Sequence, residues 1–547
     1  MKQYISDTVG NDYKSWGKNE KVFIFAQTGR GKTRFIMEEA APYWLECGYK
    51  VLILVNRRSL LKQYVYEKAL KYEQYEPDIH IKTYQEFAGR FKNENTRGWK
   101  NAFYEYNVVV LDEVHFFVSD SDFNPADTYI MWQAILHSYG QLMIFMSATP
   151  EELRPFLEEY EKHNKVYFQA LGVCRESRNK FREYQLDANY DYIRPEIIED
   201  RETMLNLIAK SKKKTVIFLD DIEQGKEIRD EIKSIAENKS IVCWDANSLE
   251  ENQEADQIMK TLCMANKLEC DVLITTSVLD NGVSIHDEDV ENIVIFAISR
   301  TSFLQMLGRV RTEDIGQLRL LLVPREPEYW ERKEKVLEEQ EKEIKRLTKG
   351  DCYEKECHFL CEAVLNDDRM LELYKKIFVL IPDREDFPVY QGEDEEMGLK
   401  VRVGRAGGKR LAINRLAVAK ILQMLQTVRR MHALSRRDIN APCHEQLSWI
   451  GKKPEDVICR ESTYLQEERD KMHRRFLEVQ DYGKNEFSCW KKDIAEQFRG
   501  TCLKHLNIKS GSPIKEKDLE EILEEHGLKL EKKMDETRQN RYTISEK

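Results

Sequence analysis

The sequence of 547 residues has no apolar run that approaches the roughly 18 residues of a membrane-spanning helix, which argues against a membrane protein. Its first residues, MKQYISDTVG, have no basic stretch followed by an apolar run, so we expect no secretory signal. The 12 cysteines lack paired spacing, which indicates reduced thiols and a cytoplasmic location instead of a disulfide framework. Internal repeats and long low-complexity segments are also lacking.

The composition that is present is typical of a soluble globular protein. Apolar residues make up 41% and charged residues 33%, and the length predicts three or four domains. The formal net charge is -11, which by itself argues mildly against a polyanionic partner. Binding depends on where the positive charge lies, however, so composition leaves the function open.

Two successive series of short apolar runs alternate with helical stretches. The first series is Lys21–Gln27, Lys50–Asn56, His80–Gln85, Asn107–Val114 and Gln141–Thr149. The second is Thr215–Leu219, Ser240–Ala246, Asp271–Val278, Asn292–Ile298 and Leu318–Val323. Continuous apolar runs are expected of parallel strands covered on both faces. We therefore predict an α/β fold with two tandem, doubly wound parallel-sheet domains, at residues 1–175 and 176–325.

After Arg325 the pattern predicts a mainly helical C-terminal region. An accessory region at residues 326–490 begins with a charge-dense helix, Glu326–Lys349, and a small module follows at 491–547. In that module we expect a helix, Glu516–His526, and then a hairpin formed by LKLEKK and NRYTIS. Such a helix and hairpin weakly resemble a winged-helix module, with a packing domain that binds no ligand as the alternative.

The segment Ala26–Thr33 (AQTGRGKT) follows a predicted strand and opens a predicted helix, Thr33–Cys47. Glycines let backbone N–H groups surround phosphates, and the helix N-terminus adds a favourable dipole. Lys32 is expected to bind the β- and γ-phosphates and Thr33 to ligate Mg²⁺, which makes ATP and Mg²⁺ the predicted cofactors. An ordinary Gly-rich turn is the alternative. The predicted nucleotide-binding residues are Thr28, Gly29, Arg30, Gly31, Lys32 and Thr33.

A carboxylate pair ends the fourth predicted strand, in the sequence Asp112-Glu113-Val114-His115. Asp112 is expected to hold Mg²⁺, and Glu113 to position and deprotonate the attacking water. The alternative is an acidic loop after a buried strand, but a phosphate loop upstream favours hydrolysis.

These motifs, and the order of those that follow them up to about Arg325, resemble superfamily 2 helicases of the DExH type. The resemblance implies two RecA-like domains and a nucleic-acid-dependent ATPase. It assigns contact with the nucleic-acid backbone to Asn56-Arg57-Arg58, and coupling of hydrolysis to strand handling to Ser147-Ala148-Thr149 together with His115. Thr275-Thr276-Ser277 and Asp280-Asn281-Gly282 resemble motif V, which bridges nucleotide and nucleic acid, and the resemblance adds Gly282 to the predicted nucleotide-binding residues. Thr83 joins the predicted nucleic-acid residues Arg57, Arg58, Thr276 and Ser277.

Gln305-Met306-Leu307-Gly308-Arg309-Val310-Arg311 resembles motif VI, which supplies arginine fingers. The usual pattern places the second arginine at Thr312, one position after Arg311, so Arg309 is the safer finger. An arginine from a second domain that stabilises charge on the γ-phosphate raises turnover by roughly 10³–10⁵-fold in NTPases, and makes hydrolysis depend on domain closure. Two arginines of an amphipathic helix are the alternative.

Three further features leave alternatives open. Tyr13 and Trp16 could stack on adenine, although a core or surface role is favoured. Met397–Arg437 contains eleven basic and no acidic residues, which suits either a phosphate-backbone contact through Arg429 and Arg430 or a solvated face paired with carboxylates. A group of Cys352, Cys357, His358 and Cys361 invites a metal site, but its spacing favours a reduced helix.

The sequence therefore predicts an ATP-dependent helicase or translocase that acts on nucleic acid, with DNA slightly favoured over RNA. One alternative is a replication or origin-binding protein whose C-terminal third binds a specific sequence. Another is a P-loop NTPase without a nucleic-acid substrate. The C-terminal third could also bind protein partners, and no membrane partner is expected.

Overall fold

The computed structural model of the chain forms two units, Met1–Arg460 and Glu461–Lys547, and each is described by itself. The structure describes residues 3–57, 60–61, 64–65, 77–92, 103–121, 124–136, 138–158, 181–220, 222–244, 261–262, 267–276, 285–310, 317–348, 369–382, 392–394, 399–401, 404–406, 409–460, 528–534 and 540–546. Predictions that fall elsewhere lie outside the described residues. They include the helix Glu516–His526, and the residues Arg58, Ser277, Asp280, Asn281, Gly282, Arg311, Cys352, Cys357, His358 and Cys361.

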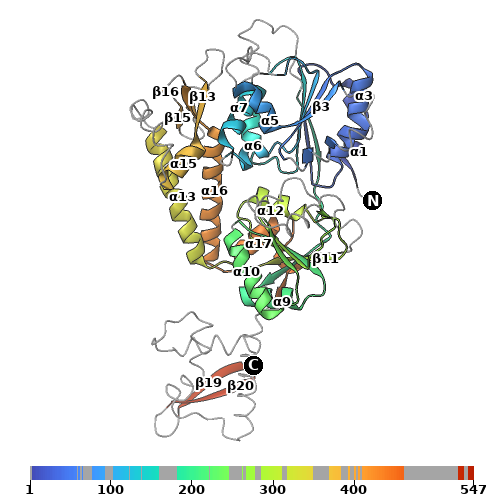
Figure 1. Cartoon of the computed structure of the whole chain (residues 1–547). Coiled ribbons are helices and arrows are strands. Elements are labelled where there is room, and N and C mark those ends of the chain that lie inside the picture. The colour runs from blue at the N-terminus through green and yellow to red at the C-terminus, as the bar shows by residue number, and fades with distance from the viewer. Residues whose placement is uncertain are drawn as a thin grey trace. The chain divides into compact units, whose positions relative to one another are not determined.

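The first sheet has six strands in the order β3-β2-β4-β5-β1-β6, and its pairings are parallel (Figure 1). Every residue of β1, β2, β4 and β5 is buried, which explains why their sequences are continuous apolar runs instead of alternating ones. The strands are β1 (Lys21–Ala26), β2 (Val51–Val55), β3 (Ile79–Thr83), β4 (Val108–Leu111), β5 (Leu142–Ser147) and β6 (Phe181–Leu186).

Helices cover both faces of this sheet. The predicted helix after the phosphate loop is confirmed, with a π-helical turn inside it: α2 (Lys32–Phe35) continues through η2 (Ile36–Ala40) into α3 (Ala41–Glu46). The other helices are α1 (Ile5–Val9), η1 (Asp12–Ser15), α5 (Tyr84–Lys92), α6 (Phe116–Ser119) and α7 (Pro125–Leu136).

The strand β6 was not predicted. It pairs with β1 in parallel along its whole length, from Phe181 to Leu186. The chain therefore still belongs to the first sheet beyond residue 175, where we expected the first domain to end.

The second sheet has seven strands in the order β18-β7-β12-β11-β8-β10-β9, again with parallel pairings. The five predicted strands are present, and β7 and β18 add to one side of them. The strands are β7 (Ile193–Ile198), β8 (Lys214–Phe218), β9 (Ile241–Trp244), β10 (Val272–Thr275), β11 (Val290–Ile295), β12 (Leu318–Leu322) and β18 (Ile458–Arg460). The helices are α9 (Arg201–Lys210), α10 (Ile222–Ile235) and α12 (Arg300–Leu307). Two parallel sheets flanked by helices are the two RecA-like domains that the sequence predicts.

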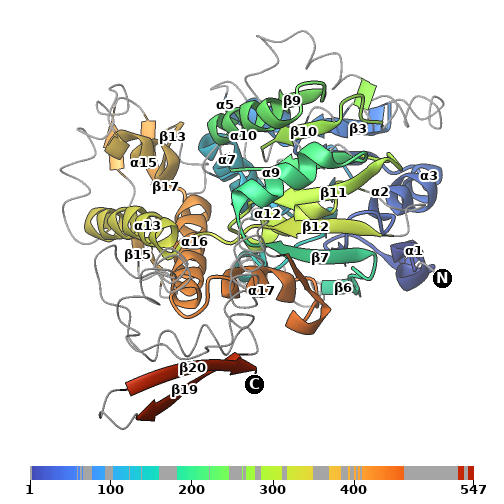
Figure 2. The same ribbon diagram turned by 90° about the horizontal axis from the view of Figure 1, so that it is seen from below.

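Long helices dominate the accessory region, as predicted, but it also contains short strands. Its helices are α13 (Pro327–Thr348), α15 (Arg369–Ile377), α16 (Arg415–Ser435) and α17 (Ala441–Ser448), followed by the 3-10 turn η6 (Pro454–Asp456). Its strands are β13 (Phe378–Pro382), β14 (Gly392–Asp394), β15 (Leu399–Val401), β16 (Gly404–Ala406) and β17 (Lys409–Ile413), in antiparallel pairings. In both views α13 and α16 lie side by side (Figures 1 and 2).

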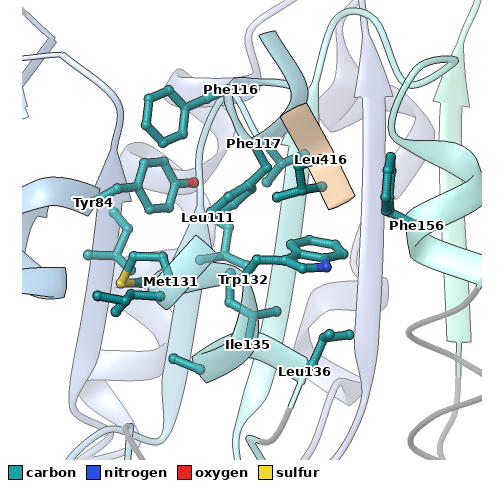
Figure 3. Close-up of a cluster of buried hydrophobic side chains, with 14 of the residues drawn as sticks. Tyr84, Leu111, Phe116, Phe117, Met131, Trp132, Ile135, Leu136, Phe156 and Leu416 are labelled. Carbon is teal, nitrogen blue, oxygen red and sulfur yellow. The ribbon is translucent and has the colours of Figure 1, made fainter. Parts of the chain in front are cut away.

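The accessory region shares a hydrophobic core with the first domain. Leu416 of α16 lies near Phe117 of α6 and Trp132 of α7 in one cluster of buried side chains (Figure 3). Val379 and Ile381 of β13 belong to the same cluster. The region thus packs directly against the elements that follow the predicted catalytic carboxylates.

In the second unit, β19 (Leu528–Met534) and β20 (Asn540–Glu546) form the predicted antiparallel hairpin. Among the residues that the structure describes, no helix is both long enough and apolar enough to cross a membrane.

Candidate nucleotide site

The phosphate loop joins β1 to α2 at the carboxyl edge of the first sheet. Gly29 and Gly31 have φ angles of 81° and 78°, in the left-handed region that glycine adopts without strain. Lys32 is buried, and its Nζ donates a hydrogen bond of 2.7 Å to the carbonyl oxygen of Ala26. Thr33 in the first turn of α2 is half-buried. The loop therefore holds its ammonium group close to the N-terminus of a helix, where phosphates bind.

Asp112 follows β4 at the same edge and is buried. Its Oδ2 accepts a hydrogen bond of 2.7 Å from the hydroxyl of Tyr64, and its Oδ1 accepts one of 2.9 Å from the backbone N–H of Glu113. Tyr84 donates to its backbone carbonyl at 2.8 Å. Burial raises the pKa of Asp112 to about 6, and the neighbouring Glu113 charge adds to this, while Tyr64 and Lys32 oppose it.

Glu113 has a φ of 50°, an uncommon backbone conformation for a residue with a side chain. This turn directs the carboxylate towards other motifs: Oε2 lies 3.4 Å from Nδ1 of His115, and Oε1 lies 3.9 Å from Nη2 of Arg309. His115 Nδ1 in turn lies 3.3 Å from the hydroxyl of Ser147, which accepts a hydrogen bond of 3.0 Å from the backbone N–H of Thr149. The two motifs of the first domain are thus directly connected.

The helix α12 of the second domain reaches the same place. Gln305 donates from Nε2 to the hydroxyl of Thr149 at 3.2 Å, and its Oε1 accepts from Nη2 of Arg309 at 3.0 Å. The side chains of Gln305 and Arg309 are both buried. The two domains also touch at the phosphate loop, because a Cβ placed on Gly308 would lie 2.9 Å from the Cβ of Thr28. Motif VI therefore lies directly against the predicted hydrolytic centre.

The residues present suit Mg²⁺. A carboxylate, Asp112, and a hydroxyl, Thr33, are the hard oxygen donors that this ion prefers, and it usually takes only one or two protein carboxylates besides water and substrate phosphates. Within the described parts of the chain, no group of three or more His, Cys, Asp or Glu residues could hold a metal ion by itself. A site completed by nucleotide phosphates agrees with both observations.

Most of the predicted nucleic-acid residues that the structure describes are engaged inside the protein. Nη2 of Arg57 lies 2.7 Å from Oδ2 of Asp120, and the hydroxyl of Thr83 accepts from the backbone N–H of Glu86 at the start of α5. Thr276, just after β10, is half-buried.

The two arginines chosen from the basic segment also contact carboxylates. Arg429 lies within 3.5 Å of three glutamates of α13, and Arg430 lies 2.8 Å from Glu445. These pairs favour the interpretation of this segment as a face paired with carboxylates. The three glutamates are Glu334, Glu338 and Glu341.

The aromatic residues before the phosphate loop have an unexpected arrangement. Tyr13 and Trp16 are buried in the core with Phe35, which agrees with the favoured core role. Tyr4, which we did not predict, lies closer to the nucleotide loop: a Cβ on Gly31 would approach its Cδ1 to 3.1 Å. The backbone N–H of Ile5 donates to the carbonyl of Arg30 at 3.0 Å. A lone tyrosine near the N-terminus carries no sequence signal for such a place.

Two family models match the chain in this order. The model described as "Type III restriction enzyme, res subunit" matches residues 2–152, and the "Helicase conserved C-terminal domain" matches residues 199–312. The two matches support a helicase of superfamily 2. The first match covers β1 to β5 of the first sheet, and the second covers β8 to β11 of the second sheet and ends directly after motif VI. As a superfamily 2 helicase-type enzyme, the chain is an ATP hydrolase.

Distant likeness to other proteins adds little. Among solved structures, S. cerevisiae Dbp5 bound to RNA and ADP BeF3 is 14% identical, with a TM-score of 0.40, over 56% of this chain and 79% of that one. A variant of Dbp5 with the same ligands is 14% identical with a TM-score of 0.39 over the same shares. At these values the likeness says nothing about activity. A search of curated protein sequences gives no match.

Proposed function

We propose that this superfamily 2 enzyme is an ATP-dependent helicase or translocase that acts on DNA in preference to RNA. The observation that carries the proposal is the contact between domains: Gln305 of α12 reaches Thr149, and Arg309, just after this helix, reaches Glu113 of the first domain. A group supplied by a second domain makes hydrolysis depend on how the two domains approach, which is how ATP turnover produces movement.

Each residue of the site has a distinct role in this proposal. Lys32 exchanges the Ala26 carbonyl for phosphate oxygens when ATP binds. Asp112 and Thr33 hold Mg²⁺, which neutralises phosphate charge when it is bound. Glu113 orients the attacking water and accepts its proton. Arg309 stabilises the negative charge that develops on the γ-phosphate.

Coupling runs through the buried hydrogen bonds between motifs. Glu113, His115, Ser147 and Thr149 form one chain of contacts, and Gln305 extends it into the second domain. A change in the position or charge of the Glu113 carboxylate on hydrolysis therefore reaches Gln305 at the domain boundary through buried hydrogen bonds.

Nucleic acid is the partner that the motif order favours. Arg57 and Thr276 follow strands and Thr83 ends one, all at the carboxyl edges of the two sheets, where parallel α/β sheets bind ligands. Arg57 would have to exchange Asp120 for a backbone phosphate, so nucleic-acid binding would release Asp120. The preference for DNA rests on the Gly-Arg-Val-Arg form of motif VI and the Asp-Asn-Gly of motif V.

Steady-state ATP hydrolysis tests the proposal directly. Turnover of the full chain is measured alone, with single-stranded DNA, with duplex DNA and with RNA, and the Glu113→Gln protein provides the contamination control. We expect DNA to raise turnover most. A larger effect of RNA would contradict the preference for DNA. If no polynucleotide changes turnover, the chain is instead a P-loop NTPase with a small-molecule or protein substrate.

A further inference from the structure

We propose that helix α16 is a strut that joins the two ATPase domains and positions Arg309, and that Asn414 is the positioning residue that fixes the strut to the first domain. The helix α16 begins well beyond the residues that the family models match. The proposal rests on the proposed role of Arg309 in ATP turnover, and it does not depend on the nucleic-acid partner.

The first end of the strut is fixed behind the catalytic carboxylates. Asn414, the N-cap residue of α16, is fully buried, and its Nδ2 donates to the carbonyl oxygens of Ser121 at 3.2 Å and Pro125 at 3.3 Å. One turn into the helix, Nζ of Lys420 donates to the carbonyl of Ser119 at 2.5 Å. All three acceptors lie in the short segment that leads from the DEVH sequence through α6 to the start of α7.

Apolar packing surrounds these hydrogen bonds. Leu416 of α16 enters the hydrophobic core of the first domain (Figure 3), and Ala419 belongs to the same cluster. The N-terminal end of α16 is therefore held by an apolar contact and by three hydrogen bonds. Together they fix the position of the helix along its own axis and its rotation about that axis.

The second end of the strut lies against the second domain. Val428 and Met431 pack on Ile298, which lies between β11 and α12, together with Trp330 of α13. The chain then turns into α17, where Nε2 of Gln446 donates to the carbonyl of Ala297 at 2.8 Å. These contacts surround the start of α12, the helix that carries Gln305.

A second contact reaches α12 itself. Trp449, just after α17, packs edge-on against Phe303, with ring centroids 5.5 Å apart. Phe303 lies two residues before Gln305 on α12, so the accessory region touches the helix from which motif VI extends.

The shaft between the two ends is stiff. α16 has 21 residues, which corresponds to about 30 Å at the rise of an α-helix. It packs along α13, and contacts of Arg429 and His432 with Glu334 tie the two helices together. A helix of this length that is paired with another transmits displacement instead of absorbing it.

The strut therefore connects the segment behind Asp112 and Glu113 to the helix that presents Arg309. During domain closure both ends of α16 have to keep their contacts with the two domains. The strut therefore limits the relative orientations that the two domains can adopt. Arg309 is then presented to the phosphates in one arrangement out of many, which lowers the barrier for turnover without adding to ATP binding.

Replacing Asn414 by aspartate tests the strut in the full chain. The carboxylate has the shape of the amide but would face two carbonyl oxygens, so the first end should be released. We expect kcat for basal ATP hydrolysis to fall about fivefold to tenfold, with KM for ATP within about twofold of the wild type. Hydrogen exchange should rise at 415–420 and also at 300–307, in the other domain.

Two matched pairs of variants separate this from a general loss of stability. Asn206→Asp makes the same change on α9, where the amide bonds only to the carbonyl of Glu202, and should leave both measurements unchanged. Lys420→Met removes one anchoring donor while Lys420→Arg keeps it, so Lys420→Arg should preserve kcat and Lys420→Met should not.

Three results would overturn the proposal. In the first, exchange rises at 415–420 in the Asn414→Asp protein while kcat and exchange at 300–307 stay unchanged. In the second, exchange rises throughout β1, β4 and β5, which would mean that Asn414 only stabilises the first domain. In the third, Lys420→Met and Lys420→Arg have equal turnover.

Discussion

In the part of the chain that the structure describes, the first sheet buries four ionisable side chains at its carboxyl edge. The second domain brings Gln305 of α12, and Arg309 just after that helix, to the same place. The four side chains of the first domain lie in the phosphate loop and directly after β4, and they form hydrogen bonds and ion pairs mainly within that domain. Gln305 and Arg309 bond across the boundary. The four are Lys32, Asp112, Glu113 and His115.

This difference separates two tasks. In the proposed function, the first domain supplies the groups expected to hold phosphate and Mg²⁺, so we expect its residues to govern ATP binding. Turnover is expected to need Arg309 from the second domain as well, and so to report on the arrangement of both. Variants on the two sides should therefore change different kinetic constants.

The largest effect is expected for Arg309→Ala. Loss of the arginine should lower kcat by roughly 10³-fold or more, with little change in ATP affinity, because the arginine acts on the charge of the transition state. ATP hydrolysis and binding of a fluorescent ATP analogue measure the two effects. Lys32→Ala is the counterpart from the first domain, and it should weaken ATP binding as well. Normal turnover in the Arg309→Ala protein would contradict the role of the second domain.

Glu113→Gln tests the first domain alone. Removal of the general base should lower kcat by about 10²–10⁴-fold, while the P-loop contacts keep ATP bound. Single-turnover hydrolysis with equilibrium binding of the analogue measures this. Glu183→Gln, an exposed change in β6, should act like the wild type. Turnover near the wild-type rate in Glu113→Gln would remove Glu113 from the chemistry.

Gly308→Ala tests the distance between the domains. An added Cβ would lie 2.9 Å from Thr28, closer than side chains approach, so the domains should be held slightly apart. We expect kcat to fall about tenfold, because misplacement of a catalytic group by about 1 Å costs up to 10²-fold. Gly89→Ala, where the glycine has open space, is the matched control. Equal turnover in both would mean that the close approach is not needed for hydrolysis.

The smallest effect is expected for Arg429→Gln. The side chain is 43% exposed, so solvent screens its ion pairs and the free energy of unfolding should fall by at most about 1 kcal/mol. Urea denaturation measures this. The salt dependence of oligonucleotide binding should remain that of the wild type, because the guanidinium already contacts carboxylates. A flatter dependence would return Arg429 to the nucleic-acid site.

Sequence patterns were sufficient for the strands that are buried on both faces, since these are continuous apolar runs. They missed β6, an edge strand whose sequence FREYQL mixes polar and apolar residues instead of forming a continuous apolar run. They also missed β7, which contains Pro195, a residue that usually argues against an internal strand. Pro195 is tolerated because β18 pairs with β7 only from Glu196 onwards.

The nucleotide residues were predictable because a short loop between a strand and a helix positions them locally. The hydrogen-bond and ion-pair partners of the site residues could not be predicted from the sequence. Tyr64 bonds to Asp112 across 48 residues of chain, and Arg429 finds its glutamates on a helix that begins at Pro327. Such pairs depend on tertiary packing, and a charge run alone does not indicate what it faces.

The left-handed backbone at Glu113 has a consequence for how this chain tolerates change. Asparagine or glycine would relax that conformation, and either would remove a negative charge from beside buried Asp112. The fold therefore favours, at this one position, residues that cannot deprotonate water. Selection of variants for heat resistance alone would drift towards inactive protein here, so a thermostable form of the enzyme has to be sought with hydrolysis as a second criterion.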